Sequence, residues 1–194
     1  MKAIERPSIL MWVALLLALH VSAQSVQPAL KETMTFIANT LNSRGIISWT
    51  TNIDQMAGYK YTSTNSLAQV NADPSTCSLA WTSITTVSPD KTVDTYLVRL
   101  QDVAGVGVQP YSRYQATQSD WKQRFSPDTY LTQMKMTTAI RGQRQSYKKD
   151  KLKSKKNLPH DHLANIRFAD EQTATRVADA LRQAAGLCGA TLQP

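Results

Sequence analysis

The sequence predicts an α+β protein with one helix near each end of the mature chain and an antiparallel sheet of about seven strands between them. Two observations lead to this fold class. After an apolar leader, apolar residues recur at helical spacing in the segments 28–42 and 171–187. The segments between them are rich in β-branched and aromatic residues and are separated by short turns. Such an order favours an antiparallel meander over βαβ units.

The chain begins with a segment typical of a secretory signal peptide. Residues 9–19 are apolar, and Val21-Ser22-Ala23 before Gln24 is the small-x-small pattern of a signal peptidase site. The apolar run is about half of the roughly 20 residues that a membrane-spanning helix needs. We therefore predict that residues 1–23 are removed by cleavage between Ala23 and Gln24, and that the protein is secreted or periplasmic. The alternative is an N-terminal anchor helix that stays uncleaved.

The mature chain divides into an N-terminal helix region, 24–44, and a β-rich domain, 45–194. In the first region, apolar residues at spacings of four, three and four fall on one helix face: Leu30, Met34, Ile37 and Leu41. Residues 42–45 supply the stop signal, which ends in Gly45.

The β-rich domain contains seven segments that predict strands, at 46–50, 59–70, 77–84, 93–103, 106–111, 130–140 and 163–168. The polar segment 112–128 is predicted to be a long loop. The lysine-rich segment 141–158 is predicted to be a second loop.

A C-terminal helix is predicted over residues 171–187. Asp170 is a suitable N-cap, and Gly186 and Gly189 supply the end. Its apolar stripe consists of Ala174, Val177, Ala178, Leu181, Ala184 and Ala185.

The two cysteines, Cys77 and Cys188, lie far apart in the mature sequence. In an oxidising compartment such a pair most simply forms one disulfide. Cys77 begins a predicted strand and Cys188 ends the predicted C-terminal helix, so the bond would tie that helix to the sheet. The alternative is two separate buried thiols.

The last strand and helix, residues 163–187, resemble the end of a pleckstrin-homology-like domain, in which a final strand turns directly into an amphipathic helix. The order of elements over residues 45–190 is similar to that fold. The whole chain is similar to uncharacterised exported bacterial proteins that add an N-terminal helix. The resemblance implies a seven-stranded PH-like barrel or a strongly bent sheet, closed by the C-terminal helix. It also implies a binding module for phospholipids, peptides or proteins. Cystatin-like and other small α+β folds share the flanking helices.

The positive charge of the mature chain is concentrated in one segment. The whole chain has a formal net charge of +8, of which the leader contributes +1 through Lys2, Arg6 and Glu5. Residues 141–156 carry eight cations against Asp150, a net +7, so the rest of the mature domain is neutral. Such a segment attracts polyanions, so we predict an anion- or partner-binding site for an anionic lipid, a polysaccharide or an acidic protein. Nucleic acid is not expected for an exported protein. The alternative is a solvated segment that only solubilises the domain. The eight cations are Arg141, Arg144, Lys148, Lys149, Lys151, Lys153, Lys155 and Lys156.

No motif of catalysis, metal binding or cofactor binding stands out. His160 and His162 provide two metal ligands where a zinc site needs three or four. The Gly-x-Ser-x-Gly pattern is missing, and Gly105-Val106-Gly107 lacks the third glycine and the following helix of a dinucleotide loop. Asp170 and Glu171 are explained by the start of a helix. We therefore predict a protein that is not an enzyme and needs no cofactor.

The aromatic residues of 111–130 form a second candidate surface, although such residues more often pack a loop onto its domain. They are Tyr111, Tyr114, Trp121, Phe125 and Tyr130.

Taken together, the sequence predicts a secreted or periplasmic, non-catalytic binding or interaction module. The alternatives are an envelope structural or assembly component that binds a protein partner, and a hydrolase whose site has no familiar pattern.

Overall fold

A computed structural model of the chain describes residues 27–53, 60–118, 123–158 and 162–193. The predicted signal peptide and its cleavage site, between Ala23 and Gln24, lie outside these residues. A first helix covers residues 27–43. The elements that follow are β1 (Ile46–Ile53), β2 (Lys60–Asp73), β3 (Ser78–Val87), β4 (Asp90–Arg99), the 3-10 turn η1 (Leu100–Asp102), β5 (Val103–Pro110), α2 (Tyr111–Gln118), β6 (Gln123–Ser126), β7 (Tyr130–Met136), β8 (Arg141–Lys148), β9 (Lys151–Asn157), β10 (Leu163–Phe168) and α3 (Glu171–Leu187).

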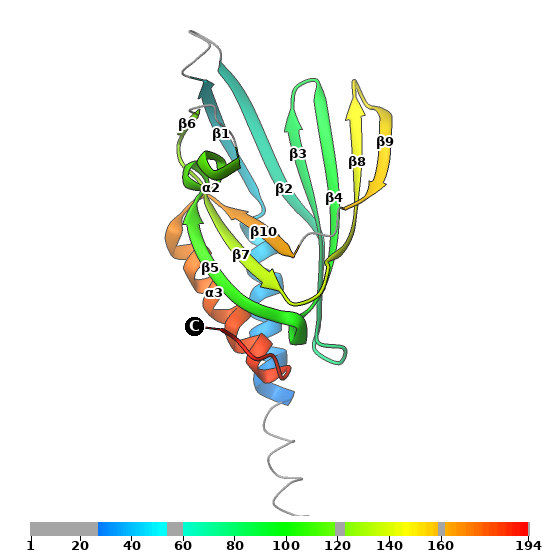
Figure 1. The fold of residues 1–194 in the computed structure, drawn as a ribbon, viewed down its shortest axis with the longest axis vertical. Helices are drawn as coiled ribbons and strands as arrows, with labels where there is room; N and C mark the ends of the chain where they lie inside the picture. Colours follow the sequence, from blue (N-terminus) through cyan, green and yellow to red (C-terminus); the bar gives the residue numbers. More distant parts are fainter. Residues whose placement is uncertain (1–26, 54–59, 119–122, 159–161, 194) are drawn as a thin grey trace, which may run out of the picture.

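The strands form two antiparallel sheets (Figure 1). The large sheet has seven strands in the order β6-β1-β2-β3-β4-β8-β9, and the small sheet has three in the order β10-β7-β5. The chain crosses from the large to the small sheet after β4, where η1 leads into β5. The predicted α+β class, its mostly antiparallel pairing and both flanking helices are confirmed. The predicted barrel is wrong, because the strands of the described residues leave the sheet open.

The large sheet presents two kinds of surface on the face that looks toward the small sheet. Leu79 and Trp81 of β3 and Val98 of β4 are buried there. Residues two apart on a strand share a face, so Ser83 and Asp94 continue the same face with polar side chains. The apolar half therefore belongs to the core, and the polar half lies beyond it.

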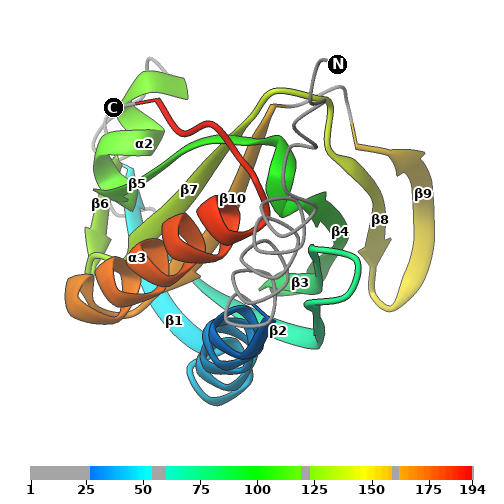
Figure 2. The same cartoon turned by 90° about the horizontal axis from the view of Figure 1, so that it is seen from below.

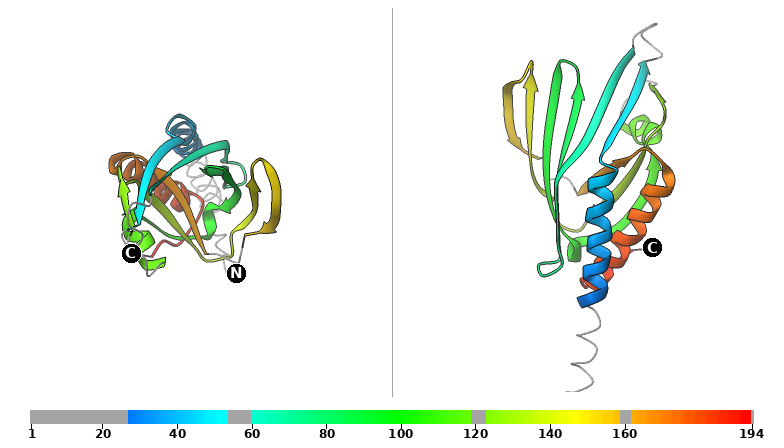
Figure 3. Two further views of the ribbon diagram at one scale, coloured as in Figure 1. Left: turned by 90° about the horizontal axis from the view of Figure 1, so that it is seen from above. Right: turned by 180° about the vertical axis from the view of Figure 1, so that it is seen from behind.

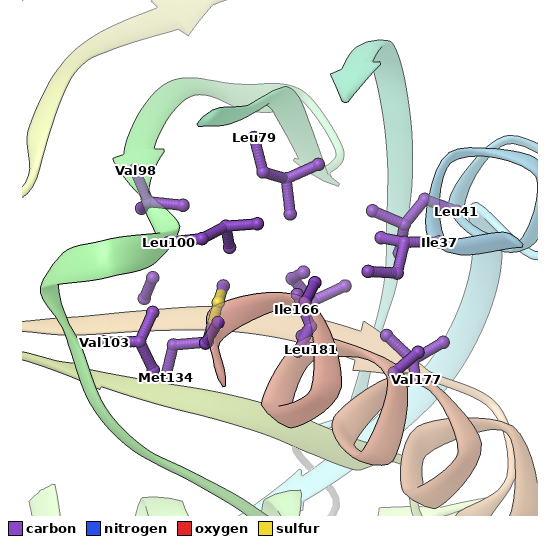
Figure 4. Packing of buried hydrophobic residues seen from close by; sticks show 14 of the residues in the cluster. Ile37, Leu41, Leu79, Val98, Leu100, Val103, Met134, Ile166, Val177 and Leu181 are labelled. Carbon is purple, nitrogen blue, oxygen red and sulfur yellow. The ribbon is translucent and has the colours of Figure 1, made fainter. Parts of the chain in front are cut away.

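The core fills the space between the apolar half of the large sheet, the small sheet and the two terminal helices. Ile37 and Leu41 of the first helix lie opposite Val177 and Leu181 of α3 (Figure 4). The other labelled residues of the cluster are Leu79, Val98, Leu100, Val103, Met134 and Ile166. The stripes predicted for both helices are buried as expected.

The small sheet is covered by α3 on one face only (Figure 2). Thr132 of β7 donates a hydrogen bond of 2.8 Å from its hydroxyl to the Ala174 carbonyl oxygen of α3. Ile166 pairs with Thr132 in register and shares that face. Asn165 and Arg167 alternate with it along β10 and therefore project from the opposite face. The small sheet thus separates the apolar core from the polar half of the large sheet.

The first helix runs beside α3 (Figure 3). Arg176 of α3 lies 5.3 Å from the ring centroid of Phe36. After this helix the chain turns into β1 at Gly45, where a Cβ atom would lie 2.7 Å from the Leu41 carbonyl oxygen. A larger residue would therefore push the helix away from the sheet.

The predicted disulfide is confirmed. Cys77 and Cys188 are bonded across 111 residues of sequence, with their Cα atoms 5.9 Å apart. Cys77 lies in the turn between β2 and β3, and Cys188 is the C-cap residue of α3. The bond therefore joins the large sheet to the helix that covers the small sheet.

Both predicted loops contain regular structure. Segment 112–128 includes most of α2 and all of β6, which pairs with β1 through Thr51↔Phe125. Segment 141–158 folds as the hairpin of β8 and β9. In both cases pairing with a distant strand supplies the order that the polar sequence does not indicate. The predicted strand 93–103 also ends earlier, at Arg99, because η1 turns the chain toward the small sheet.

Within the described ranges, none of the helices combines the length and the apolar character that a membrane-spanning helix requires.

Candidate functional site

The predicted anion-binding residues lie on the hairpin of β8 and β9, which we call the basic hairpin (residues 141–157; Figure 1). β8 pairs with β4 from Asp90↔Lys148 to Leu97↔Arg141. β9 pairs with β8 and is the last strand at this edge of the large sheet. The turn between them has two residues, Lys149 and Asp150, with φ angles of 48° and 60°. Two consecutive positive φ angles are those of a type I′ turn, whose twist matches a hairpin.

An ion pair on the inner face anchors the basic hairpin to the sheet. Asp94 and Arg144 are opposite each other in register. The Arg144 guanidinium donates from Nε to Asp94 Oδ1 and from Nη2 to Asp94 Oδ2, both at 2.7 Å. The hydrogen bond to Asp94 raises the pKa of Arg144. The sequence predicts Arg144 as a binding residue, but its Nε and Nη2 groups already donate to the Asp94 carboxylate.

The outer face of the basic hairpin is ordered by contacts around Tyr147. Its hydroxyl donates a hydrogen bond of 2.5 Å to Gln145 Oε1. Lys91 Nζ of β4 lies 4.9 Å from the centroid of the Tyr147 ring. The Lys149 backbone N–H donates to the Pro89 carbonyl oxygen at 3.1 Å. These contacts fix the hairpin against the adjoining β3–β4 turn.

The six lysines of the basic hairpin are exposed to solvent: Lys148, Lys149, Lys151, Lys153, Lys155 and Lys156. Lys156 is opposite Arg144 and Lys155 is opposite Gln145, so successive lysines project from both faces of the sheet. Asp150 is the one acidic residue among them, and its carboxylate lies 3.8 Å from Lys91 Nζ. Leu152, beside the turn, keeps 53 % of its surface exposed. The outer strand and turn of the hairpin therefore combine exposed cationic side chains with one exposed apolar side chain.

Arg141 lies apart from the lysines, at the base of β8. It lines a cavity of about 460 Å³ between β4, η1 and the segment that enters β8. Leu97, Arg99 and Asp102 line the same cavity. Asp102 Oδ2 accepts a hydrogen bond of 2.9 Å from the Thr138 hydroxyl. The eight predicted cations therefore separate into six exposed lysines around the turn and along β9, one ion-paired arginine and one arginine at the base.

Exposed ammonium groups on a fixed hairpin can hold phosphate or carboxylate groups as point charges. Such contacts weaken as salt is added, because exposed charges are screened over about 8–10 Å at physiological ionic strength. Lysines on an edge strand also have a purely structural use, since they discourage pairing with other edge strands.

The other residues considered in the sequence occupy separate places. His160 and Trp121 lie outside the described residues. His162 Nδ1 lies 3.2 Å from the Met136 carbonyl oxygen. Among the aromatic residues, Tyr111 packs on Trp49 with ring centroids 6.0 Å apart. Tyr114 stacks on Tyr111 at 6.1 Å.

The sequence reasoning missed Asp94, because an acidic residue in an alternating strand gives no sign of its partner 50 residues later. The one available sign is that β4 and β8 carry residues of opposite charge, Asp94 and Arg144, but only the strand register places them opposite each other.

Comparisons of the chain with models of known protein families, with curated proteins and with solved structures find no match.

Proposed function

We propose that this protein is an exported, non-catalytic binding module that holds an anionic partner on the basic hairpin. The observation that carries the proposal is the set of six exposed lysines on a hairpin that is fixed to the sheet by the Asp94–Arg144 pair. The disulfide fits an oxidising compartment. The resemblance to pleckstrin-homology-like modules remains a prediction, and it agrees with a binding role.

Anionic lipid headgroups and acidic polysaccharides are the partners that this surface fits best. Each lysine near an anionic membrane contributes about 1 kcal/mol, and the exposed Leu152 can enter the boundary between headgroups and acyl chains. An acidic polysaccharide contacts the lysines and does not need Leu152. The two partners therefore differ in their dependence on Leu152.

The first test compares two charge-matched triple variants. One replaces Lys151, Lys153 and Lys155 of β9 with glutamine, and the control replaces Lys31, Arg44 and Lys135, which are exposed elsewhere. Binding to vesicles with a quarter phosphatidylglycerol, and to immobilised heparin, is measured at low and at physiological salt. We expect the β9 variant to bind at least about tenfold more weakly, a loss of about 1.4 kcal/mol. Equal weakening in both variants would mean that only net charge matters and would overturn the proposal.

The second test separates the partners. Leu152→Ala should weaken vesicle binding while heparin binding stays the same, if lipid is the partner. An assembly component is favoured instead if in-cell cross-linking gives a stoichiometric protein partner whose yield is unaffected by salt and by the β9 substitutions. The free edge of β9 is the observation that keeps this second candidate, because an edge strand can accept an added strand.

A further inference from the structure

A second polar site lies between the two sheets, away from the basic hairpin. A partly open cavity of about 160 Å³ lies between the polar half of the large sheet, the uncovered face of the small sheet and α2. Its polar lining includes Asn65, Ser83, Thr85, Asp94, Asn165 and Arg167. These residues come from β2, β3, β4 and β10, so only the folded chain brings them together. At about 30 Å³ for each molecule of liquid water, the cavity holds about five waters.

Arg167 is the charged residue of this cavity that has a buried donor atom without an acceptor among the described residues. Its guanidinium carbon lies 3.8 Å from the ring centroid of Trp49 and 3.3 Å from that of Tyr111, so two aromatic rings hold it. Arg167 Nη1 is buried, and no hydrogen-bond acceptor for it is present among the residues that the structure describes. Because buried charged donors are nearly always satisfied, this one requires an acceptor from outside the chain, either water or a ligand.

The acidic groups nearby are committed to other partners. Asp94, on the opposite wall, accepts both hydrogen bonds of Arg144. Asp128 accepts a hydrogen bond of 2.6 Å from the Ser112 hydroxyl and another of 2.9 Å from the Thr129 N–H. Burial lowers the pKa of Arg167, while Tyr111 and Asp128 partly offset that effect. An arginine nevertheless stays protonated in a protein. Asp128 is therefore the nearby negative charge that partly balances Arg167, while Nη1 of Arg167 has no hydrogen-bond acceptor among the described residues.

The neutral residues of the lining supply matching hydrogen-bond groups. Asn65, which also lines the cavity, donates from Nδ2 to the Ser83 and Thr85 hydroxyls at 2.8 and 3.0 Å. Asn165 Oδ1 accepts from Gln133 Nε2 at 3.0 Å, which leaves its amide N–H groups as donors. A donor amide beside a fixed guanidinium suits an oxyanion.

We propose that this inter-sheet pocket binds a small organic anion, whose carboxylate or phosphate group is held by Arg167 and Asn165. The planar guanidinium offers two parallel N–H donors to such a group. The cavity volume limits the ligand to a few atoms beyond the oxyanion. The pocket adjoins the basic hairpin through the Asp94–Arg144 pair, but the inference does not use the six exposed lysines.

The test is a titration of the full chain with sodium acetate, sodium glycolate and inorganic phosphate at constant ionic strength, balanced with chloride. Binding is followed by NMR through the Nε–Hε signal of Arg167 and the side-chain amide signals of Asn165. We expect saturable shifts of both signals with a millimolar midpoint for at least one of these anions. Saturation by phosphate alone would identify the oxyanion as phosphate, and saturation by acetate or glycolate would identify a carboxylate.

Two variants and two controls assign the shifts to the pocket. Arg167→Lys keeps the charge but loses the planar fork, and should weaken binding at least about tenfold as read from Asn165. Asn165→Ala leaves the stack of Trp49, Arg167 and Tyr111 in place and should weaken binding severalfold as read from Arg167. Arg99→Lys and the β9 triple variant should bind like the wild type. If none of the three anions moves either signal in folded protein, or if Arg167→Lys binds as tightly as the wild type, the proposal is wrong.

Discussion

Breaking the disulfide should cost this protein a large part of its stability. The bond between Cys77 and Cys188 closes a loop of 111 residues. In the chain-entropy model, closing a loop of about 100 residues stabilises the folded state by about 4.7 kcal/mol. Residual structure in the unfolded chain reduces this figure, so we expect the Cys77→Ser, Cys188→Ser variant to lose about 3–4 kcal/mol.

Urea unfolding followed by far-UV circular dichroism measures this loss. With a slope of about 2 kcal/mol per molar urea, the midpoint should fall by about 1.5–2 M in the double variant. Reduced wild type should match the variant, and the reductant should leave the variant unchanged. If oxidised and reduced wild type unfold at the same urea concentration, the loop-closure reasoning fails for this chain.

Three further predictions concern turns and close contacts. Replacing Lys149 with Asn and Asp150 with Gly should stabilise the basic hairpin by about 1 kcal/mol, because both positions have positive φ angles, which Asn and Gly adopt more easily. The backbone amides of β9 should then exchange their hydrogens more slowly, whereas faster exchange would contradict a type I′ turn. Gly142→Ala should destabilise the protein by about 1–3 kcal/mol, because the added Cβ would overlap the Thr95 carbonyl oxygen. The control is Gly107→Ala, where a Cβ meets nothing within 4 Å among the described residues. If the two variants have the same midpoint of urea unfolding, the overlap is refuted. Hydrogen bonds from Ser75 and Thr76 lower the pKa of Asp73. The contribution of Asp73 to stability is therefore present above its ordinary pKa of about 3.9 and is lost as the pH falls through the lowered pKa. In NMR the Ser75 amide signal should follow this titration in the wild type and should show no such titration in Asp73→Ala.

The sequence predicts best those elements whose signals are local. The bounds of α3 agree with the predicted 171–187, because the apolar stripe and the Asp170 cap are both read within one segment. Asp170 Oδ1 accepts the Thr173 N–H at 2.7 Å, as an N-cap does. The disulfide also follows from a short argument, since two cysteines in a chain that is predicted to be exported leave few choices.

The basic hairpin was missed because nothing local in its sequence indicates strands. β9 is a run of exposed, mostly charged residues without apolar alternation, and its turn is Lys149-Asp150 where Asn-Gly would be the usual signal. Its order comes from β4, which lies about 50 residues earlier and supplies Asp94 to Arg144. The inter-sheet pocket was missed for the same reason, because Arg167 looks like an ordinary strand residue until Trp49 and Tyr111 are placed beside it.

The alternation along β10 has a consequence for engineering. Ala164, Ile166 and Phe168 pack into the core, whereas Asn165 faces the inter-sheet pocket. One short strand therefore carries two interleaved sets of positions under separate constraints. Substitutions at Asn165 would therefore change the lining of the pocket while every core side chain of β10 stays as it is.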